Sequence, residues 1–173
     1  THYVNSNPDL DNDGLDDIDY AATRSNIQNI FTNTLKNNLT TEDFLYVFVS
    51  DHGIYSPNGF VAWGNELIED QELASWVDQV QCGTKVFVFE QCYGGGFVIE
   101  YDGNDGDVID NYTTGVAAAS YDETSWEGLS QPAFTTYVDW TFSFVSALRG
   151  CEPWNYPWED GERVDAYSAN DGR

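Results

Sequence analysis

The sequence predicts an α/β fold in which a mainly parallel sheet is flanked by helices. Two apolar runs, residues 44–50 (FLYVFVS) and 86–91 (VFVFEQ), have the length and the β-branched and aromatic content of strands buried in a parallel sheet. Segments with helical periodicity lie before, between and after these runs. Strands that alternate with crossover helices imply a parallel sheet with helices on both faces.

The composition fits one globular domain over residues 1–173, because 41% of the residues are hydrophobic. The net charge is −24, from 30 acidic and 6 basic residues. This charge argues against nucleic acid and anionic membrane surfaces as partners, and it suits bound calcium or a cationic substrate. No apolar run approaches the roughly 20 residues that a membrane span needs.

Residues 1–20 form an acidic segment with the spacing of a calcium loop, in which alternating carboxylates converge on one cation. The matching residues are Asp9, Asp11, Asp13 and Asp17, with Gly14 at the sharp turn and Leu15 where a backbone carbonyl is the ligand. An EF-hand is incomplete because Tyr20 replaces the bidentate glutamate, and the spacing resembles shorter aspartate-rich calcium loops of secreted and cell-surface proteins. We therefore expect a calcium site and an extracellular or cell-surface setting; the alternative is an acidic surface turn.

The first helix is predicted over residues 19–39, where Ile27, Ile30, Phe31 and Leu35 share one face. The strand over residues 44–50 is expected to be buried on both faces. A loop over residues 55–59 then leads to a short strand or hairpin arm over residues 60–63.

Further elements follow along the chain. A second amphipathic helix is predicted over residues 69–80, with its apolar stripe formed by Leu73, Trp76, Val77 and Val80. The strand over residues 86–91, a short strand over 115–120 and a third helix over 132–148 complete the order. The cysteines are odd in number, and a Cys82–Cys151 pair would leave Cys92 free.

The two main strands end at residues that suit nucleophilic catalysis. His52 follows the first strand and Cys92 the second, and the helix between them predicts parallel strands that end at the same edge of the sheet. A nearby imidazole is the expected activator of a cysteine thiol. The amide of Gly53, paired with that of Cys92, would stabilise an oxyanion. Taken separately, the two residues are better explained as a structural histidine and a small core cysteine.

Asp51-His52-Gly53 after one apolar strand and Glu90-x-Cys92 with a glycine run after another resemble the caspase-fold cysteine peptidases. VFVSDHG and VFVFEQC are most similar to legumain and its bacterial relatives, whereas CYGGGF is closer to the clostripain and gingipain types. The resemblance spans roughly residues 44–148. It implies a caspase-like three-layer α/β/α sandwich with a mainly parallel sheet, and a catalytic dyad of His52 and Cys92.

Substrate preference is expected to depend on Glu90, which points to the same side of its strand as Cys92. In the resembling families this position lines the pocket for P1, the residue before the scissile bond. The negative charge favours Arg or Lys at P1, with Asn as the competitor; the alternative is that Glu90 binds a backbone amide. By resemblance, Ser125 and Asp122 supply another pocket wall. Asp51 either orients the imidazole or caps the strand end.

These features together predict a calcium-binding cysteine endopeptidase that acts on proteins or peptides without an organic cofactor, with calcium in a structural or activating role. Two alternatives stay open: a transpeptidase or ligase of the same fold, and a catalytically inactive calcium-binding surface module. In the resembling families a first strand and helix precede the calcium-loop region, and this chain lacks them. An N-terminal fragment or propeptide is therefore an expected partner.

Overall fold

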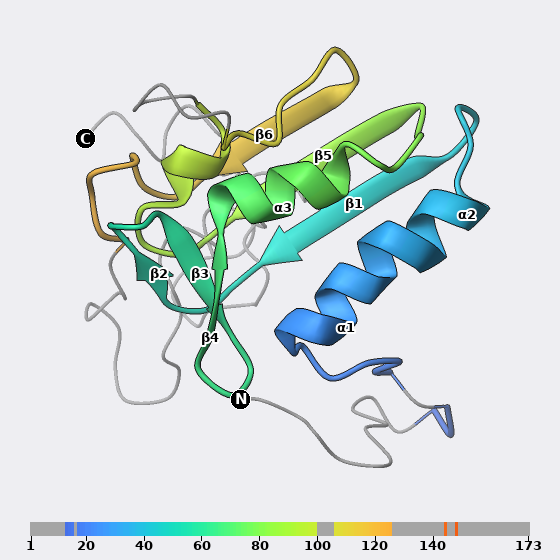
Figure 1. The fold of residues 1–173 in the computed structure, drawn as a ribbon, viewed down its shortest axis with the longest axis horizontal. Helices are drawn as coiled ribbons and strands as arrows, with labels where there is room; N and C mark the ends of the chain where they lie inside the picture. Colours follow the sequence, from blue (N-terminus) through green and yellow to red (C-terminus); the bar gives the residue numbers. More distant parts are fainter. Residues whose placement is uncertain (1–12, 16, 100–105, 126–143, 145–147, 149–173) are drawn as a thin grey trace, which may run out of the picture.

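The structure, a computed structural model, describes residues 13–15, 17–99, 106–125, 144 and 148 (Figure 1). These residues contain two three-stranded sheets with helices packed beside them. Within the described part of the chain, no helix combines the length and apolar character needed to cross a membrane.

Sheet A is the parallel sheet that the sequence predicts. It has the order β1-β5-β6, with β1 at Phe44–Val49, β5 at Thr84–Phe89 and β6 at Thr113–Ala117. Both pairings are parallel, and Val49 lies opposite Phe89 at the carboxyl end. The predicted adjacency of the two main strands is therefore confirmed. β6 begins two residues earlier than the strand predicted over 115–120.

Sheet B is a small antiparallel sheet inserted after β1. Its strands are β2 (Gly53–Ile54), β3 (Gly59–Ala62) and β4 (Glu66–Glu69), in the order β2-β3-β4. The hairpin arm predicted over residues 60–63 is confirmed as β3. The sequence analysis missed β4, because its four residues ELIE lack the length and the β-branched content that mark a strand.

The first predicted helix is continuous, but it starts later than predicted and is π-helical in its middle. It comprises α1 (Arg24–Asn29), the π-helical segment η1 (Ile30–Leu35) and α2 (Lys36–Asn38). It starts at Arg24 and not at residue 19, because the Thr23 side chain caps it by accepting from the Asn26 backbone N–H.

The second predicted helix is observed as α3 (Asp70–Val77), which begins after β4. Its first turn carries acidic residues, as the helix dipole favours. The predicted apolar stripe is confirmed, since all its members are buried: Leu73, Trp76, Val77 and Val80.

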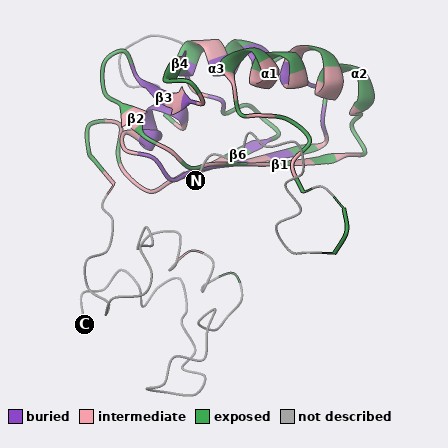
Figure 2. Cartoon of the chain, turned by 90° about the horizontal axis from the view of Figure 1, so that it is seen from below, coloured by how far each residue is buried: buried purple, intermediate pink, exposed green. Residues whose placement is uncertain are grey.

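The described helices cover one face of sheet A, as the edge-on view in Figure 2 shows. Along β1, Phe44, Tyr46 and Phe48 are 61%, 48% and 40% exposed, while the alternate residues face the core. The prediction that β1 is buried on both faces is therefore wrong for the described structure, because α1 and α3 pack on one side only. The helix predicted over residues 132–148 lies outside the described residues, except for Phe144 and Leu148.

A chain of phenylalanine rings runs through the core from η1 to sheet B. Phe31 stacks on Phe87 with ring centroids 6.5 Å apart, and Phe87 stacks on Phe89 at 5.9 Å. Phe89 stacks on Phe97 at 4.7 Å, and Phe97 contacts Phe60 at 5.8 Å. Each aromatic pair adds about 1 kcal/mol beyond area burial. The chain therefore ties β5 to both the helical layer and the 3-10 helix η2 (Gly94–Phe97).

Cys82 is a buried free thiol next to the start of β5. Its Sγ donates to the Asp43 carbonyl at 2.9 Å. The possible partner, Cys151, lies outside the described residues. The Cys82 thiol is therefore used as a local hydrogen-bond donor in the structure.

The connection between β5 and β6 depends on a partly buried ion pair. The Lys85 side chain is 4% exposed, and its Nζ lies 2.8 Å from Asp110 Oδ2. Asp110 Oδ1 accepts from the Tyr112 N–H and the Thr113 hydroxyl, both at 2.7 Å. Desolvation alone would raise the pKa of Asp110, but the hydrogen bonds from Lys85, Thr113 and Tyr112 outweigh it and hold the pKa below its usual value.

We predict that Asp110→Asn destabilises the protein at pH 7, because it leaves the Lys85 charge buried and unpaired. The expected loss is about 2 kcal/mol, less than for a fully buried pair because the carboxylate is 39% exposed. A depressed pKa stabilises the fold above the unfolded value of about 4, and this stabilisation disappears as the pH falls through the folded value.

Urea unfolding at pH 7 and at pH 2.5 measures this effect. The difference between wild type and Asp110→Asn should shrink at the lower pH. Asp78→Asn on the exposed end of α3 is the matched control and should change little. An equal difference at both pH values would contradict the pairing.

Candidate active site

The carboxyl ends of β1 and β5 lie side by side and lead into the two predicted catalytic segments. The ladder continues one residue beyond β5, because the Glu90 N–H donates to the Val49 carbonyl at 2.9 Å. The chain then reaches His52 three residues after β1 and Cys92 three residues after β5. Parallel pairing thus converts a separation of 40 positions in the sequence into one sheet edge.

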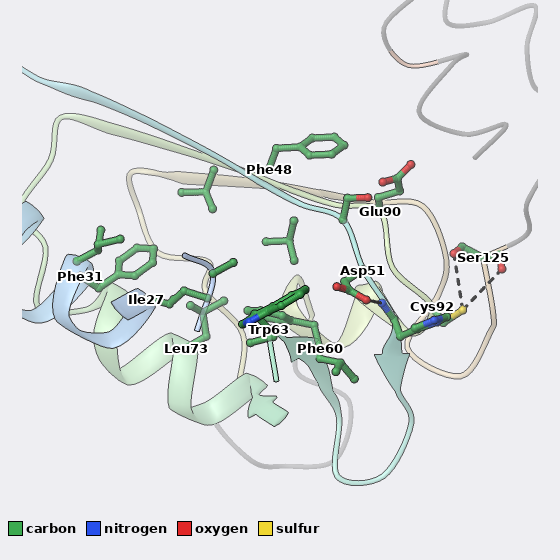
Figure 3. Close-up of a pocket in the computed structure, with 18 residues that line it drawn as sticks. Ile27, Phe31, Phe48, Asp51, Phe60, Trp63, Leu73, Glu90, Cys92 and Ser125 are labelled. Atoms are coloured by element: carbon green, nitrogen blue, oxygen red, sulfur yellow. Dashed lines mark hydrogen bonds between the residues drawn. The ribbon is translucent and has the colours of Figure 1, made fainter. Parts of the chain in front are cut away.

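A cavity of about 770 Å³ opens at this edge (Figure 3). Its polar end is lined by Asp51, His52, Glu90, Cys92 and Ser125. It continues as an apolar cleft between the first helix and the sheets, and the labelled residues there are Ile27, Phe31, Phe60, Trp63 and Leu73. The structure therefore brings His52 and Cys92 into one cavity, as the two strand ends predict.

The Cys92 thiol lies at the cavity wall and is partly exposed, so it is not a small core residue. Its Sγ is 3.6 Å from the Ser125 carbonyl oxygen and 3.7 Å from the Ser125 hydroxyl (Figure 3). Ser125 was predicted as a pocket wall, and the structure places it against the thiol. Asp122 is exposed and does not line the cavity. Its predicted place in the P1 pocket is therefore not supported.

Gly53 brings the His52 segment against Cys92. A Cβ on Gly53 would overlap the Cys92 carbonyl oxygen, so only glycine permits this contact. The Val61 N–H donates to the His52 carbonyl at 2.8 Å, and Gly53 lies opposite Phe60. In this register Gly53 and Phe60 form a non-hydrogen-bonded pair. The Gly53 N–H therefore points away from β3. The amide is thus not used by the hairpin.

Asp51 supports the backbone of the neighbouring histidine. Its Oδ1 accepts from the His52 N–H at 2.6 Å. Of the two predicted roles, this contact matches capping of the strand end. The carboxylate also lines the cavity beside His52.

Glu90 is 5% exposed and lines the same cavity as Cys92, whereas the intervening Gln91 is 2% exposed and does not line it. That Glu90 and Cys92 point to one side stays a prediction, because the same cavity is also lined by consecutive residues such as Val47, Phe48 and Val49. Two basic residues of the described chain are engaged elsewhere. Arg24 pairs with Glu72, and Lys85 pairs with Asp110.

Only part of the predicted calcium loop is described. Asp13 Oδ1 accepts from the Leu15 N–H at 2.8 Å, which closes a local turn, and Asp17 is exposed. Asp9 and Asp11 lie outside the described residues. Among the residues that the structure describes, no three His, Cys, Asp or Glu side chains are grouped to hold a metal ion.

The sequence analysis missed two residues next to Cys92. Tyr93 has a left-handed backbone with φ of 60°, and Asn58 is buried against it. The sequence pattern predicts that the glycine run at residues 94–96 forms the turn after Cys92, and it places Asn58 in a loop. No sequence signal marks a tyrosine in this conformation, since non-glycine residues rarely adopt it.

A cysteine and a histidine facing one cavity at the carboxyl edge of a parallel sheet define the class of caspase-fold cysteine peptidases. The chain matches the model of the peptidase C13 family over residues 15–152, and it belongs to this family of legumain-type cysteine peptidases. Its activity is hydrolysis of peptide bonds, so its substrates are proteins or peptides. A comparison with curated proteins finds no match.

We predict that Gly53→Ala lowers kcat/KM for peptide hydrolysis about 100-fold, because the added methyl group pushes Cys92 out of position. Ile54→Ala, on the adjacent and partly exposed position of β2, is the matched control and should retain activity. Initial rates with a fluorogenic peptide measure both variants. Near wild-type activity of Gly53→Ala in a folded protein would show that the close contact is not needed.

Proposed function

We propose that this peptidase is an endopeptidase that uses His52 and Cys92 as its catalytic dyad. The observation that carries the proposal is the single cavity at the edge of sheet A that both side chains line. Gly53 adds support because its backbone packs on the backbone of Cys92. The two candidate oxyanion donors, the N–H groups of Gly53 and Cys92, therefore belong to segments in direct contact.

In the proposed reaction, His52 takes the thiol proton and the Cys92 thiolate bonds to the scissile carbonyl carbon. The C–N bond then breaks as His52 gives its proton to the leaving amine. This leaves a thioester on Cys92. Water attacks the thioester, the new carboxylic acid leaves, and the proton returns to the thiol through His52.

The amides of Gly53 and Cys92 stabilise the negative oxygen that forms in each tetrahedral intermediate. A single donor of this kind is worth about 3 kcal/mol of barrier. The Gly53 N–H suits this role because it points away from β3.

The proposed P1 preference is Arg or Lys, with Asn as the competitor. Glu90 supports it because the residue is 5% exposed and lines the cavity that Cys92 lines. A buried carboxylate at this position would pair with a guanidinium or ammonium group of the substrate. The hydroxyl of Ser125, at the same end of the cavity, would supply a polar wall.

A P1-scanning fluorogenic peptide library tests the dyad and the preference together. Cleavage should be strongest after Arg or Lys, and Cys92→Ala and His52→Ala should each lower kcat at least about 1000-fold. Glu90→Gln should lower kcat/KM for Arg substrates about 10- to 100-fold, because a charge-assisted hydrogen bond is lost. Glu123→Gln, an exposed glutamate near Ser125, is the control.

The outcomes separate the parts of the proposal. Strong cleavage after Asn, with none after Arg or Lys, would refute the P1 preference and leave the dyad standing. Full activity of His52→Ala would refute the dyad. Formation of an amide product when an amine nucleophile is added would assign the chain to the transpeptidases.

We also propose that residues 1–20 bind calcium through Asp9, Asp11, Asp13, Asp17 and the Leu15 carbonyl. The net charge of −24 and the alternating carboxylates support this proposal, because a divalent cation relieves their repulsion. Calcium should raise the melting temperature by several degrees relative to chelator, and magnesium should not. Equal melting temperatures in calcium and chelator would refute the site.

An extracellular or cell-surface setting, and an N-terminal fragment or propeptide as partner, complete the proposal. The acidic composition supports the setting. For the partner, β1 is an edge strand of sheet A among the described residues, and a further strand would fit beside it.

A further inference from the structure

The residue after the proposed nucleophile has a strained backbone. Tyr93 has φ of 60° and ψ of 16°, the left-handed conformation. This conformation is unfavourable for a residue with a side chain and persists only where its surroundings hold it. Tyr93 turns the chain from β5 into η2, so its conformation sets how Cys92 is presented.

Three hydrogen bonds hold the peptide groups on either side of Tyr93. Its N–H donates to the Glu123 carbonyl at 2.8 Å. Its own carbonyl accepts from the Gly96 N–H within η2 and from Asn58 Nδ2, both at 3.1 Å, and Asn58 is the donor that comes from outside this turn. The Tyr93 ring also packs on Tyr55, with centroids 5.4 Å apart. Tyr55 and Asn58 both belong to the loop between β2 and β3, which follows His52.

Asn58 is itself held firmly. It is 3% exposed, and its backbone carbonyl accepts from the Asp70 N–H at 3.1 Å. Its amide group lies flat on Gly96, where an added Cβ would come within 2.6 Å of Cγ and Oδ1. The side chain therefore has little freedom to turn away from Tyr93.

The Asn58 side chain makes one hydrogen bond where it could make more. Within the described residues its buried Oδ1 has no partner, although burying a polar atom unpaired is costly. An apolar residue would avoid this cost. What Asn58 supplies at this position is the N–H group that it donates to Tyr93.

We propose that Asn58 is a positioning residue that keeps Tyr93 in its left-handed conformation and so keeps Cys92 in register with Gly53. This inference rests on the proposed function, in which Cys92 is the nucleophile. The link is the Cys92–Tyr93 peptide group, whose carbonyl oxygen packs on Gly53. If Tyr93 relaxes, this peptide group rotates and the two oxyanion donors separate.

The kinetic test compares Asn58→Ala in two backgrounds. In the wild-type background kcat should fall about 10- to 100-fold with KM nearly unchanged, as expected when the reacting groups are misplaced. In the Tyr93→Gly background, the same substitution should cost less than about threefold, because glycine adopts the left-handed conformation without strain. An equal cost in both backgrounds would overturn the proposal.

Amide hydrogen exchange provides a readout that does not depend on turnover. Asn58→Ala should speed exchange of the Tyr93 and Gly94 amides about tenfold and leave the amides of α3 unchanged. Asn58→Asp, which keeps the side-chain shape but removes the donor, serves if Asn58→Ala fails to fold.

Each result decides a different claim. Unchanged exchange at Tyr93 and Gly94 overturns the inference whether or not the wild type is active. Faster exchange with unchanged kcat overturns the role in positioning the nucleophile. If the wild type cleaves no peptide, the proposed function fails and the positioning role fails with it, while faster exchange would still support the hydrogen bond as the restraint on Tyr93.

Discussion

Parallel pairing of β1 with β5 is the constraint on which the site depends. With Val49 opposite Phe89, the segments that carry His52 and Cys92 leave the sheet at the same level. A shift of one residue would turn alternate side chains to the other face and move Glu90 out of the cavity. The register is held by the core behind it, where Phe87 and Phe89 stack between the helical layer and η2.

The hairpin β2–β3 adds a second level of control, because it contacts the Cys92 turn at two points. Gly53 packs on the Cys92 carbonyl, and Asn58 holds the carbonyl of the next residue. Sheet B therefore connects the histidine segment to the nucleophile turn directly, in addition to the connection through sheet A. These two contacts add to the strand pairing in fixing the geometry of the site.

Sequence reasoning was successful where periodicity and strand ends carry the information. The parallel strands, the stripe of α3 and the shared edge for His52 and Cys92 follow from such patterns. It was wrong about burial of both faces of β1, because an apolar run does not reveal which face a helix covers. It missed Asn58 and Tyr93, because a left-handed tyrosine and its single buried donor depend on tertiary contacts that no local pattern encodes.

The most direct test of the account is covalent labelling with an acyloxymethyl ketone that carries arginine, followed by peptide mass spectrometry. The reagent should modify Cys92 in the wild type and should react much more slowly in His52→Ala. Cys82 is a buried thiol and serves as an internal control that should stay unmodified. Labelling of Cys92 at the same rate without His52 would contradict the proposed dyad, and so would a Cys92 that reacts neither with this reagent nor with its Lys and Asn counterparts.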